Sequence, residues 1–238
     1  MSDFIIFRKN VEEPIVYSIP WPLESFSGKS QETSFTMSYS EKFLSVTIDA
    51  FCQILPPESK RSQKGRVFED DCLEIFIRPQ SSPESFFPAS FYYGWEVGFN
   101  GALLDYKAGI GDEGERIIGS GNGSSVTDGS GAKEGVEPVH GILRENICGT
   151  RISFDYDWKS KAAVLSKVVG KGQWQVSLEI PWTDFGIEKP PVEEIWYFTV
   201  NRIDVSSKDG KIGLACLHEG ITEPRFHQPF LFPSLKFA

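Results

Sequence analysis

The sequence predicts an all-β fold, an antiparallel β-sandwich of the jelly-roll or immunoglobulin-like type, and three observations support this prediction. Short runs of alternating and β-branched residues recur along the chain between turn signals. No segment has the long, regular apolar period of an amphipathic helix. Aromatic residues make up 13% of the chain, with 19 Phe, 6 Trp and 7 Tyr, and rings suit pleated surfaces and sandwich cores.

The expected strands follow one another through most of the chain. The first half contains Phe35–Tyr39, Phe43–Ala50, Cys72–Ile77, Phe91–Phe99 and Ala102–Tyr106. The second half contains Arg151–Tyr156, Ala162–Val169, Trp174–Ile180, Ile195–Ile203, Ile212–Leu217 and Leu235–Phe237. Asn100-Gly101 is expected to join two of these strands as a hairpin turn. Only Glu113–Ile118 and Thr183–Gly186 suggest short turns of helix.

Alternation assigns side chains to the two faces of the strand Phe91–Phe99. One face takes Tyr93, Trp95, Val97 and Phe99, and the other takes Tyr92 and Glu96. Core packing is the ordinary role of a ring such as Trp95 on an apolar face.

A single domain is expected to span residues 1–238. Residues 109–149 are rich in Gly and Ser, and such a segment cannot bury enough surface to form its own core. We expect a flexible insertion there, because the strands on either side are too few to fold alone. Long loops of this kind can carry function or be inert, and the sequence leaves both possibilities open.

Charge and composition exclude some partners and compartments. The formal net charge is −9, from 33 Asp and Glu against 24 Lys and Arg, and this argues against nucleic acid as a partner. No apolar stretch approaches the length of a membrane span, so no membrane is expected either. The chain starts without a signal-peptide pattern. It is expected to be cytoplasmic as written, and secreted or periplasmic if a signal peptide has been removed.

Motifs for catalysis are missing from the sequence. It contains no GxSxG, no P-loop, no HExxH and only three histidines. Carboxylates are numerous enough for a glycosidase pair, but any acidic protein offers such pairs. We therefore expect no enzyme.

Four ordered motifs resemble the family 9 carbohydrate-binding modules, and together they span about residues 15–238. They are Val67–Ile77, Tyr92–Val97 with the Asn100-Gly101 turn, Trp174–Trp182 with its Glu-Ile-Pro-Trp end, and the group formed by Asn201-Arg202, Ile212–His218, Phe226-His227-Gln228-Pro229 and Leu235-Lys236-Phe237. The resemblance implies an antiparallel β-sandwich, bound structural Ca2+ and a mono- or oligosaccharide recognised between aromatic rings.

The resemblance also implies which residues contact the sugar. Phe68 stands where the family has a stacking Trp or Tyr, and Glu74, Asn201 and Arg202 match its polar residues. Tyr92, Trp95, Asn100 and His218 complete the set of candidate sugar contacts. Asp70 and Asp71 are the candidate calcium ligands, because calcium prefers oxygen donors.

Each candidate also has an ordinary structural explanation. Phe68 can be a core ring, Glu74 can lie on a solvated face, and Asp70 and Asp71 can be turn residues at the start of a strand. The chain departs from the family at Cys216, close to the expected position of a second stacking Trp. Tyr92, Trp95 or His218 are the possible replacements for that ring.

The leading hypothesis is non-catalytic carbohydrate binding, with the sugar stacked on rings and bracketed by polar side chains. An intracellular structural or protein-interaction sandwich that has lost sugar binding is the first alternative. A glycoside-processing enzyme is the second. The sequence leaves open which sugar is bound, whether calcium is bound and what the oligomeric state is.

Overall fold

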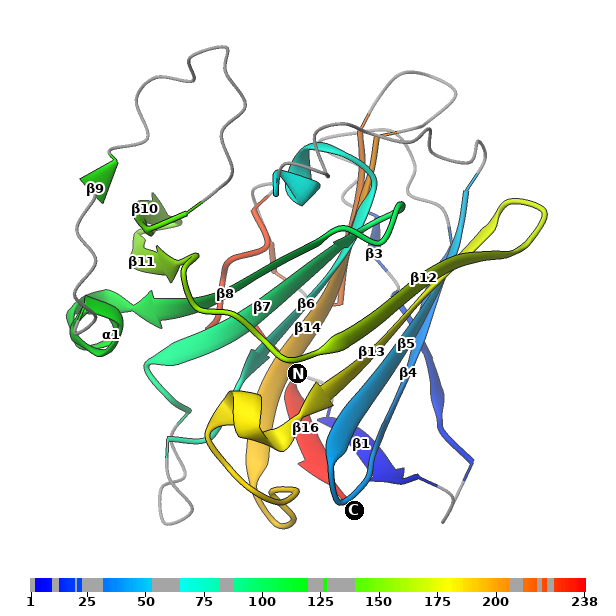
Figure 1. The fold of residues 1–238 in the computed structure, drawn as a ribbon, viewed down its shortest axis with the longest axis horizontal. Coiled ribbons are helices and arrows are strands. Elements are labelled where there is room, and N and C mark those ends of the chain that lie inside the picture. The colour runs from blue at the N-terminus through cyan, green and yellow to red at the C-terminus, as the bar shows by residue number, and fades with distance from the viewer. Residues whose placement is uncertain are drawn as a thin grey trace.

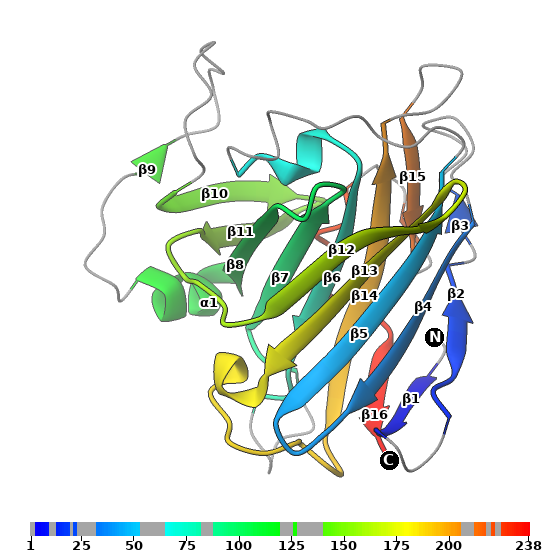
Figure 2. The ribbon, with the colours of Figure 1, turned by 45° about the vertical axis from the view of Figure 1, so that its right-hand side comes forward.

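The computed structural model describes residues 3–9, 13–19, 21–22, 32–52, 65–81, 88–119, 126–127, 140–205, 212–217, 220–221 and 225–238. Within these ranges it consists of sixteen strands, which form two facing β-sheets, one short α-helix and short 3-10 turns (Figures 1 and 2). No described helix has the length and hydropathy that crossing a membrane requires.

The first sheet, sheet B, is antiparallel through its main strands. Its order is β12 (Ala163–Gly170), β13 (Gln173–Pro181), β5 (Phe43–Phe51) and β4 (Thr33–Tyr39), with β2 (Val16–Ser18) paired to β4. Strands β5 and β4 alternate strictly between buried and half-exposed residues, so one face of sheet B is the core face.

The second sheet, sheet A, is longer. Its order is β16 (Ser234–Phe237), β14 (Ile195–Asp204), β6 (Cys72–Arg78), β7 (Phe91–Gly98), β8 (Leu103–Ile110), β11 (Thr150–Asp155), β10 (Ile142–Ile147) and β9 (Val126–Thr127). Strand β15 (Gly213–Cys216) pairs with β14, and β3 (Trp21–Pro22) pairs with β15. Every residue of β6 is buried, because both faces of this sheet are covered there.

Strand β1 (Asp3–Arg8) joins the two sheets. Its residues 3–6 pair in parallel with β16, and its next two residues pair in parallel with β4. The strand pairing is therefore mixed, with these parallel pairs among mostly antiparallel ones.

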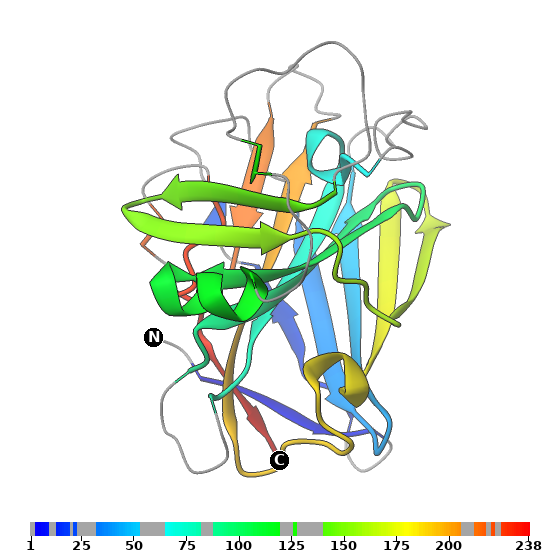
Figure 3. The ribbon, with the colours of Figure 1, turned by 60° about the vertical axis from the view of Figure 1, so that its left-hand side comes forward.

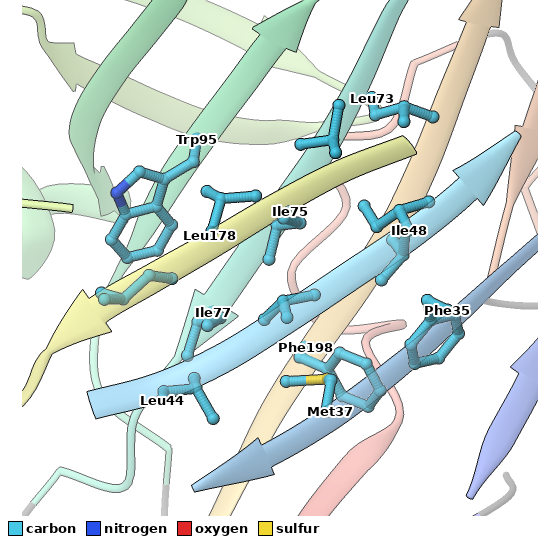
Figure 4. Packing of buried hydrophobic residues seen from close by; sticks show 14 of the residues in the cluster. Phe35, Met37, Leu44, Ile48, Leu73, Ile75, Ile77, Trp95, Leu178 and Phe198 are labelled. Carbon is cyan, nitrogen blue, oxygen red and sulfur yellow. The ribbon is translucent and has the colours of Figure 1, made fainter. Parts of the chain in front are cut away.

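The main core lies between the sheets (Figure 4). Sheet B contributes Phe35, Met37, Leu44, Ile48 and Leu178, and sheet A contributes Leu73, Ile75, Ile77, Trp95 and Phe198. The alternate residues of β6 and β7 face the other way, into a second cluster on the outer face of sheet A. The β-sandwich predicted from the sequence is confirmed.

On the outer face of sheet A, side chains of β6, β7, β8, β10 and β11 pack with Phe226 and Phe232. Helix α1 (Gly111–Gly119) packs beside it against β8 and β11 (Figure 3). A side chain on Gly109 would meet the backbone of Gly114 at 2.3 Å, so the helix lies directly on the strand. These contacts give the sheet a second hydrophobic layer.

Each strand predicted from the sequence is present, and its ends agree within two residues except at Ala102–Tyr106, where the observed strand β8 continues to Ile110. The Asn100-Gly101 turn is also confirmed, with Gly101 at φ 82° and its N–H bonded to the Gly98 carbonyl. The predicted helical turns correspond to α1 and to η3 (Trp182–Phe185). Strands β1, β2, β3, β9 and β10 were not predicted.

The insertion expected at 109–149 is in part regular structure. It contains the end of β8, α1, β9 and β10, while residues 120–125 and 128–139 lie outside the described residues. The four cysteines have no disulfide, and only Cys148 is exposed.

Candidate functional site

A cleft of about 540 Å³ opens on the outer face of sheet A. Its lining comes from η2 (Val67–Glu69), from strands β6, β7, β10, β11, β14 and β15, and from the segment 225–227. The residues are Phe68, Glu74, Glu96, Leu143, Glu145, Asn146, Ile147, Phe154, Tyr156, Ile203, Leu214, Arg225, Phe226 and His227. The cleft is thus formed by segments that are far apart in the sequence.

Strand register brings three polar side chains together on the floor. Glu74 of β6 lies opposite Glu96 of β7 on one side and opposite Asn201 of β14 on the other. Residues directly opposite in antiparallel strands point to the same face of the sheet. All three are almost completely buried, with exposed fractions of 0–3%.

Hydrogen bonds fix most of the oxygens in this cluster. The Asn201 amide donates to Glu74 Oε2 at 3.3 Å, and the Cys72 thiol points to Glu74 Oε1 at 3.8 Å. The Tyr106 hydroxyl donates to Glu96 Oε1 at 3.0 Å. Among the described residues, Glu96 Oε2 has no hydrogen-bond partner.

Burial changes the protonation of both carboxyls. It raises the pKa of Glu96 to about 7, against the lowering effect of the Tyr106 hydrogen bond. Burial, and then the neighbouring charge of Glu96, raise the pKa of Glu74 well above its ordinary value. Two anions this close in a buried site are unfavourable, so the pair retains a proton at neutral pH.

Gly94 makes room for the phenol of Tyr106. A Cβ at this position would lie 2.3 Å from the Tyr106 ring. Gly94 and Tyr106 are cross-strand partners in β7 and β8, so the missing side chain lets the ring lie flat across the sheet and reach Glu96.

Phe68 provides an accessible aromatic surface at the edge of the cleft. Phe68 is 37% exposed. The Arg66 guanidinium lies 5.9 Å from the centre of the Phe68 ring. Arg66 also pairs with Glu69, which fixes the short 3-10 turn that presents the ring. The rings of Phe154, Tyr156 and Phe226 also line the cleft but are largely buried.

His227 supports the floor beneath these rings. Its imidazole stacks on Phe76 with centres 4.7 Å apart, and its Nδ1 shares a hydrogen bond of 2.8 Å with the Tyr92 hydroxyl. Phe154 approaches the imidazole edge-on at 4.9 Å. These contacts form an aromatic floor beneath the cleft.

The structure brings four of the sequence-predicted contacts to this site. Phe68 and Glu74 line the cleft. Asn201 donates a hydrogen bond to Glu74, and the Tyr92 hydroxyl shares a hydrogen bond with His227.

The other candidate contacts lie elsewhere. Trp95 and Arg202 point between the sheets because each is next in its strand to a residue of the cleft face. Trp95 packs in the main core and donates to Ser160 Oγ at 2.9 Å, while Arg202 pairs with Asp204 at 3.0 Å. The Asn100 side chain caps its own turn at Ala102 N. His218 lies outside the described residues.

The candidate calcium ligands, Asp70 and Asp71, directly precede strand β6. Asp71 is buried, and its carboxylate accepts the Val205 N–H at 3.1 Å. Among the described residues, no group of three or more His, Cys, Asp or Glu side chains converges in a way that could hold a metal ion. The calcium prediction therefore rests on the resemblance alone.

Several cleft residues were not singled out from the sequence. Glu96 had been assigned to the same face as Tyr92, and this alternation was the available signal for it. Strand β10, which carries Glu145, gave no strand pattern. Arg225 comes to the cleft through a loop whose course no local pattern predicts.

Comparison with known proteins identifies the fold. No family model and no curated protein matches the sequence. Several solved structures match, with identities too low to show more than a shared fold. A presumed carbohydrate-binding protein of Bacteroides uniformis ATCC 8492 matches with a TM-score of 0.56 and 14% identity, covering 100% of this chain and 98% of that one.

The second is a family 9 carbohydrate-binding module of Caldicellulosiruptor kristjanssonii, in complex with cellotriose. It has a TM-score of 0.55 and 11% identity, over 100% of this chain and 94% of that chain. A family 9 module from the same organism, in complex with glucose, has a TM-score of 0.50 and 12% identity over 98% and 95%. The chain has the β-sandwich fold of the family 9 carbohydrate-binding modules.

Proposed function

We propose that this protein is a non-catalytic carbohydrate-binding protein that takes a sugar in the cleft on the outer face of sheet A. The observation that carries the proposal is that an exposed ring, Phe68, and a buried carboxyl–amide cluster, Glu74 with Asn201, line the same cleft or hold its floor. The C–H face of a pyranose packs on an aromatic ring. Carboxylate oxygens accept hydrogen bonds from the sugar hydroxyls.

The fold supports the choice of ligand class. The similar modules of Caldicellulosiruptor kristjanssonii are in complex with cellotriose and with glucose. A monosaccharide fits a cleft of about 540 Å³, since small-molecule sites typically measure about 300–1,000 Å³. We therefore propose glucose and short glucans as the first ligands to test.

Calorimetric titration with glucose, cellobiose and cellotriose tests this function. Wild-type protein should bind at least one of them at millimolar concentration or better. Glu74→Gln should weaken that binding about tenfold, because the amide nitrogen cannot accept the hydrogen bond that a carboxyl oxygen accepts, and a buried donor left unpaired costs about 1–3 kcal/mol. Glu188→Gln is the matched control, because this exposed glutamate lies outside the cleft and receives the same replacement.

Two results would contradict the proposal. Lack of binding by the folded wild-type protein at millimolar sugar would favour the scaffold alternative. Hydrolysis of aryl glycosides that is lost in Glu74→Gln would show an enzyme instead.

A further inference from the structure

The unpaired oxygen of Glu96 is the feature of the cleft that neutral-sugar binding leaves unexplained. Glu96 is 3% exposed and lines the cleft, and among the described residues its Oε2 has no hydrogen-bond partner. Leaving a buried polar atom unpaired is unfavourable, because the atom has lost its water partners without gaining a protein one. An atom in this state at the floor of an open cleft indicates a ligand group that donates to it.

The charges around this atom favour a cationic donor. Three carboxyls line the cleft, against one guanidinium and one imidazole. The titratable and charged groups that face the pair or line the cleft are Cys72 and Glu74 of β6, Tyr92 of β7, Tyr106 of β8, Glu145 of β10, Tyr156 beyond β11, and Arg225 and His227. The nearest of these to Glu96 are acids or phenols. The Nδ1 atom of the His227 imidazole already shares a hydrogen bond with the Tyr92 hydroxyl.

The aromatic lining adds a second attraction for a cation. The rings of Phe68, Phe154, Tyr156 and Phe226 line the same cleft as the carboxyls. A cation over the face of such a ring gains about 0.5–2 kcal/mol, and the gain is larger when water is excluded. Carboxylates and rings that line one cleft favour an ammonium group.

We propose that the cleft is selective for an amino sugar whose free ammonium group binds at Glu96, beside Glu74. An ammonium has three donors and no acceptor, so it can donate to Glu96 Oε2 and to Glu74 at the same time. A neutral hydroxyl supplies one donor and leaves the charge of the pair uncompensated. This inference rests on the proposed sugar binding at the same cleft and specifies its ligand class.

Proton release gives the proposal a distinct signature. The pair retains a proton at neutral pH, since burial raises the pKa of Glu96 to about 7 and raises the pKa of Glu74 well above its ordinary value. An incoming ammonium replaces this proton. Calorimetry at neutral pH in buffers of different ionisation enthalpy should therefore show proton release with an amino sugar and none with glucose.

Competition among three sugars that differ at one position tests the selectivity. Glucosamine should bind the wild-type protein about tenfold more tightly than glucose, a difference of about 1.4 kcal/mol. N-acetylglucosamine, which lacks the charge, should show no such gain. Glu96→Gln should reduce the ratio of glucose to glucosamine dissociation constants to about one, and Glu188→Gln should leave that ratio as in the wild type.

The outcomes separate this inference from the proposed function. Glucose binding with no preference for glucosamine in the wild-type protein would overturn the inference and leave sugar binding intact. Failure of all neutral and amino sugars to bind would overturn both. Binding of calcium chloride alone, lost in Glu96→Gln, would assign the carboxyl pair to a metal ion and overturn the amino-sugar inference.

Discussion

Two glutamates on adjacent strands give the cleft its chemistry and also lower the stability of the fold. Glu74 and Glu96 are cross-strand partners with exposed fractions of 3% each. Their burial disfavours the charged state, so the folded protein holds protons that the unfolded chain releases. Ionising either carboxyl in this site therefore costs stability.

This linkage predicts a fall in stability with rising pH. The pKa of Glu96 is about 7 in the folded protein against an ordinary value of 4.5. A raised pKa stabilises the fold below pH 4.5, and that contribution is lost as pH rises through about 7. Glu96→Gln should therefore raise the free energy of unfolding above pH 7, by on the order of 3 kcal/mol.

Thermal and urea unfolding between pH 5 and pH 8 measure this effect. The wild type should lose stability relative to Glu96→Gln across that window, and Glu188→Gln should follow the wild type. Parallel pH profiles for the wild type and Glu96→Gln would contradict a raised pKa at this carboxyl.

Phe68 should matter for binding and little for stability. Phe68→Ala should weaken sugar binding about tenfold, because stacking against a ring contributes on the order of 1 kcal/mol or more. Its melting temperature should change by only a few degrees, since the residue is 37% exposed. Phe51→Ala on sheet B, where the ring is 45% exposed, is the control and should leave binding unchanged.

The candidate site could be predicted from the sequence only as far as strand alternation was applied. Alternation placed Trp95 on the apolar face and Glu96 on the opposite face, and the structure has them so. The same rule separates Asn201 from Arg202, because neighbours in a strand cannot share a face. The resemblance had grouped these two, and only Asn201 contacts the cleft cluster.

At the scale of elements, the predicted strands have residue patterns of their own, whereas the missed strand β10 has none. Strands β4 and β5 alternate over their full length. Strand β10 has the sequence Ile-Leu-Arg-Glu-Asn-Ile and owes its conformation to antiparallel pairing with β11. Pairing with a partner strand is tertiary context, which overrides the weak local preference of such a segment.

Helix α1 and strand β8 are held together by a contact between glycines. In an exposed helix, Gly→Ala stabilises by about 0.5–1 kcal/mol. At Gly114 a Cβ would lie 2.4 Å from the Ser90 carbonyl oxygen and 2.5 Å from Gly109 C. Gly114→Ala should therefore destabilise the protein by about 1–3 kcal/mol, a penalty typical of overpacking.

Chemical denaturation compares this variant with Arg116→Ala, an exposed position of the same helix. The control should change stability by less than about 0.5 kcal/mol. Stabilisation by Gly114→Ala would mean that the helix does not lie against β8 as described.

At the scale of the whole molecule, β1 couples the two sheets. Ile6 is 1% exposed in the main core, while its neighbour Ile5 is 41% exposed. Ile6→Ala should cost about 2–5 kcal/mol of unfolding free energy, and Ile5→Ala should cost less than about 1 kcal/mol. Denaturant unfolding of the two variants checks this. Equal losses of unfolding free energy would contradict the placement of Ile6 in the core and Ile5 at the surface.

Sheet A has two covered faces, and this limited what the sequence could reveal about the cleft. Strand β6 is buried throughout, so its pattern predicts a buried strand without indicating which face holds a site. The tryptophans Trp95, Trp174, Trp182 and Trp196 all pack in the core between the sheets, and Trp158 packs against it. None of these five described tryptophans lines the cleft, so their fluorescence is a poor reporter of it.

An amide NMR titration with a sugar tests the central claim most directly, because it reports both binding and its location. Glucosamine and glucose should shift the resonances of residues 67–74, Glu96, 143–147 and 225–227, which surround the cleft. Strands β12 and β13 on the other sheet should be unaffected. Shifts confined to β12 and β13, or no shifts at millimolar sugar, would contradict a sugar site on the outer face of sheet A.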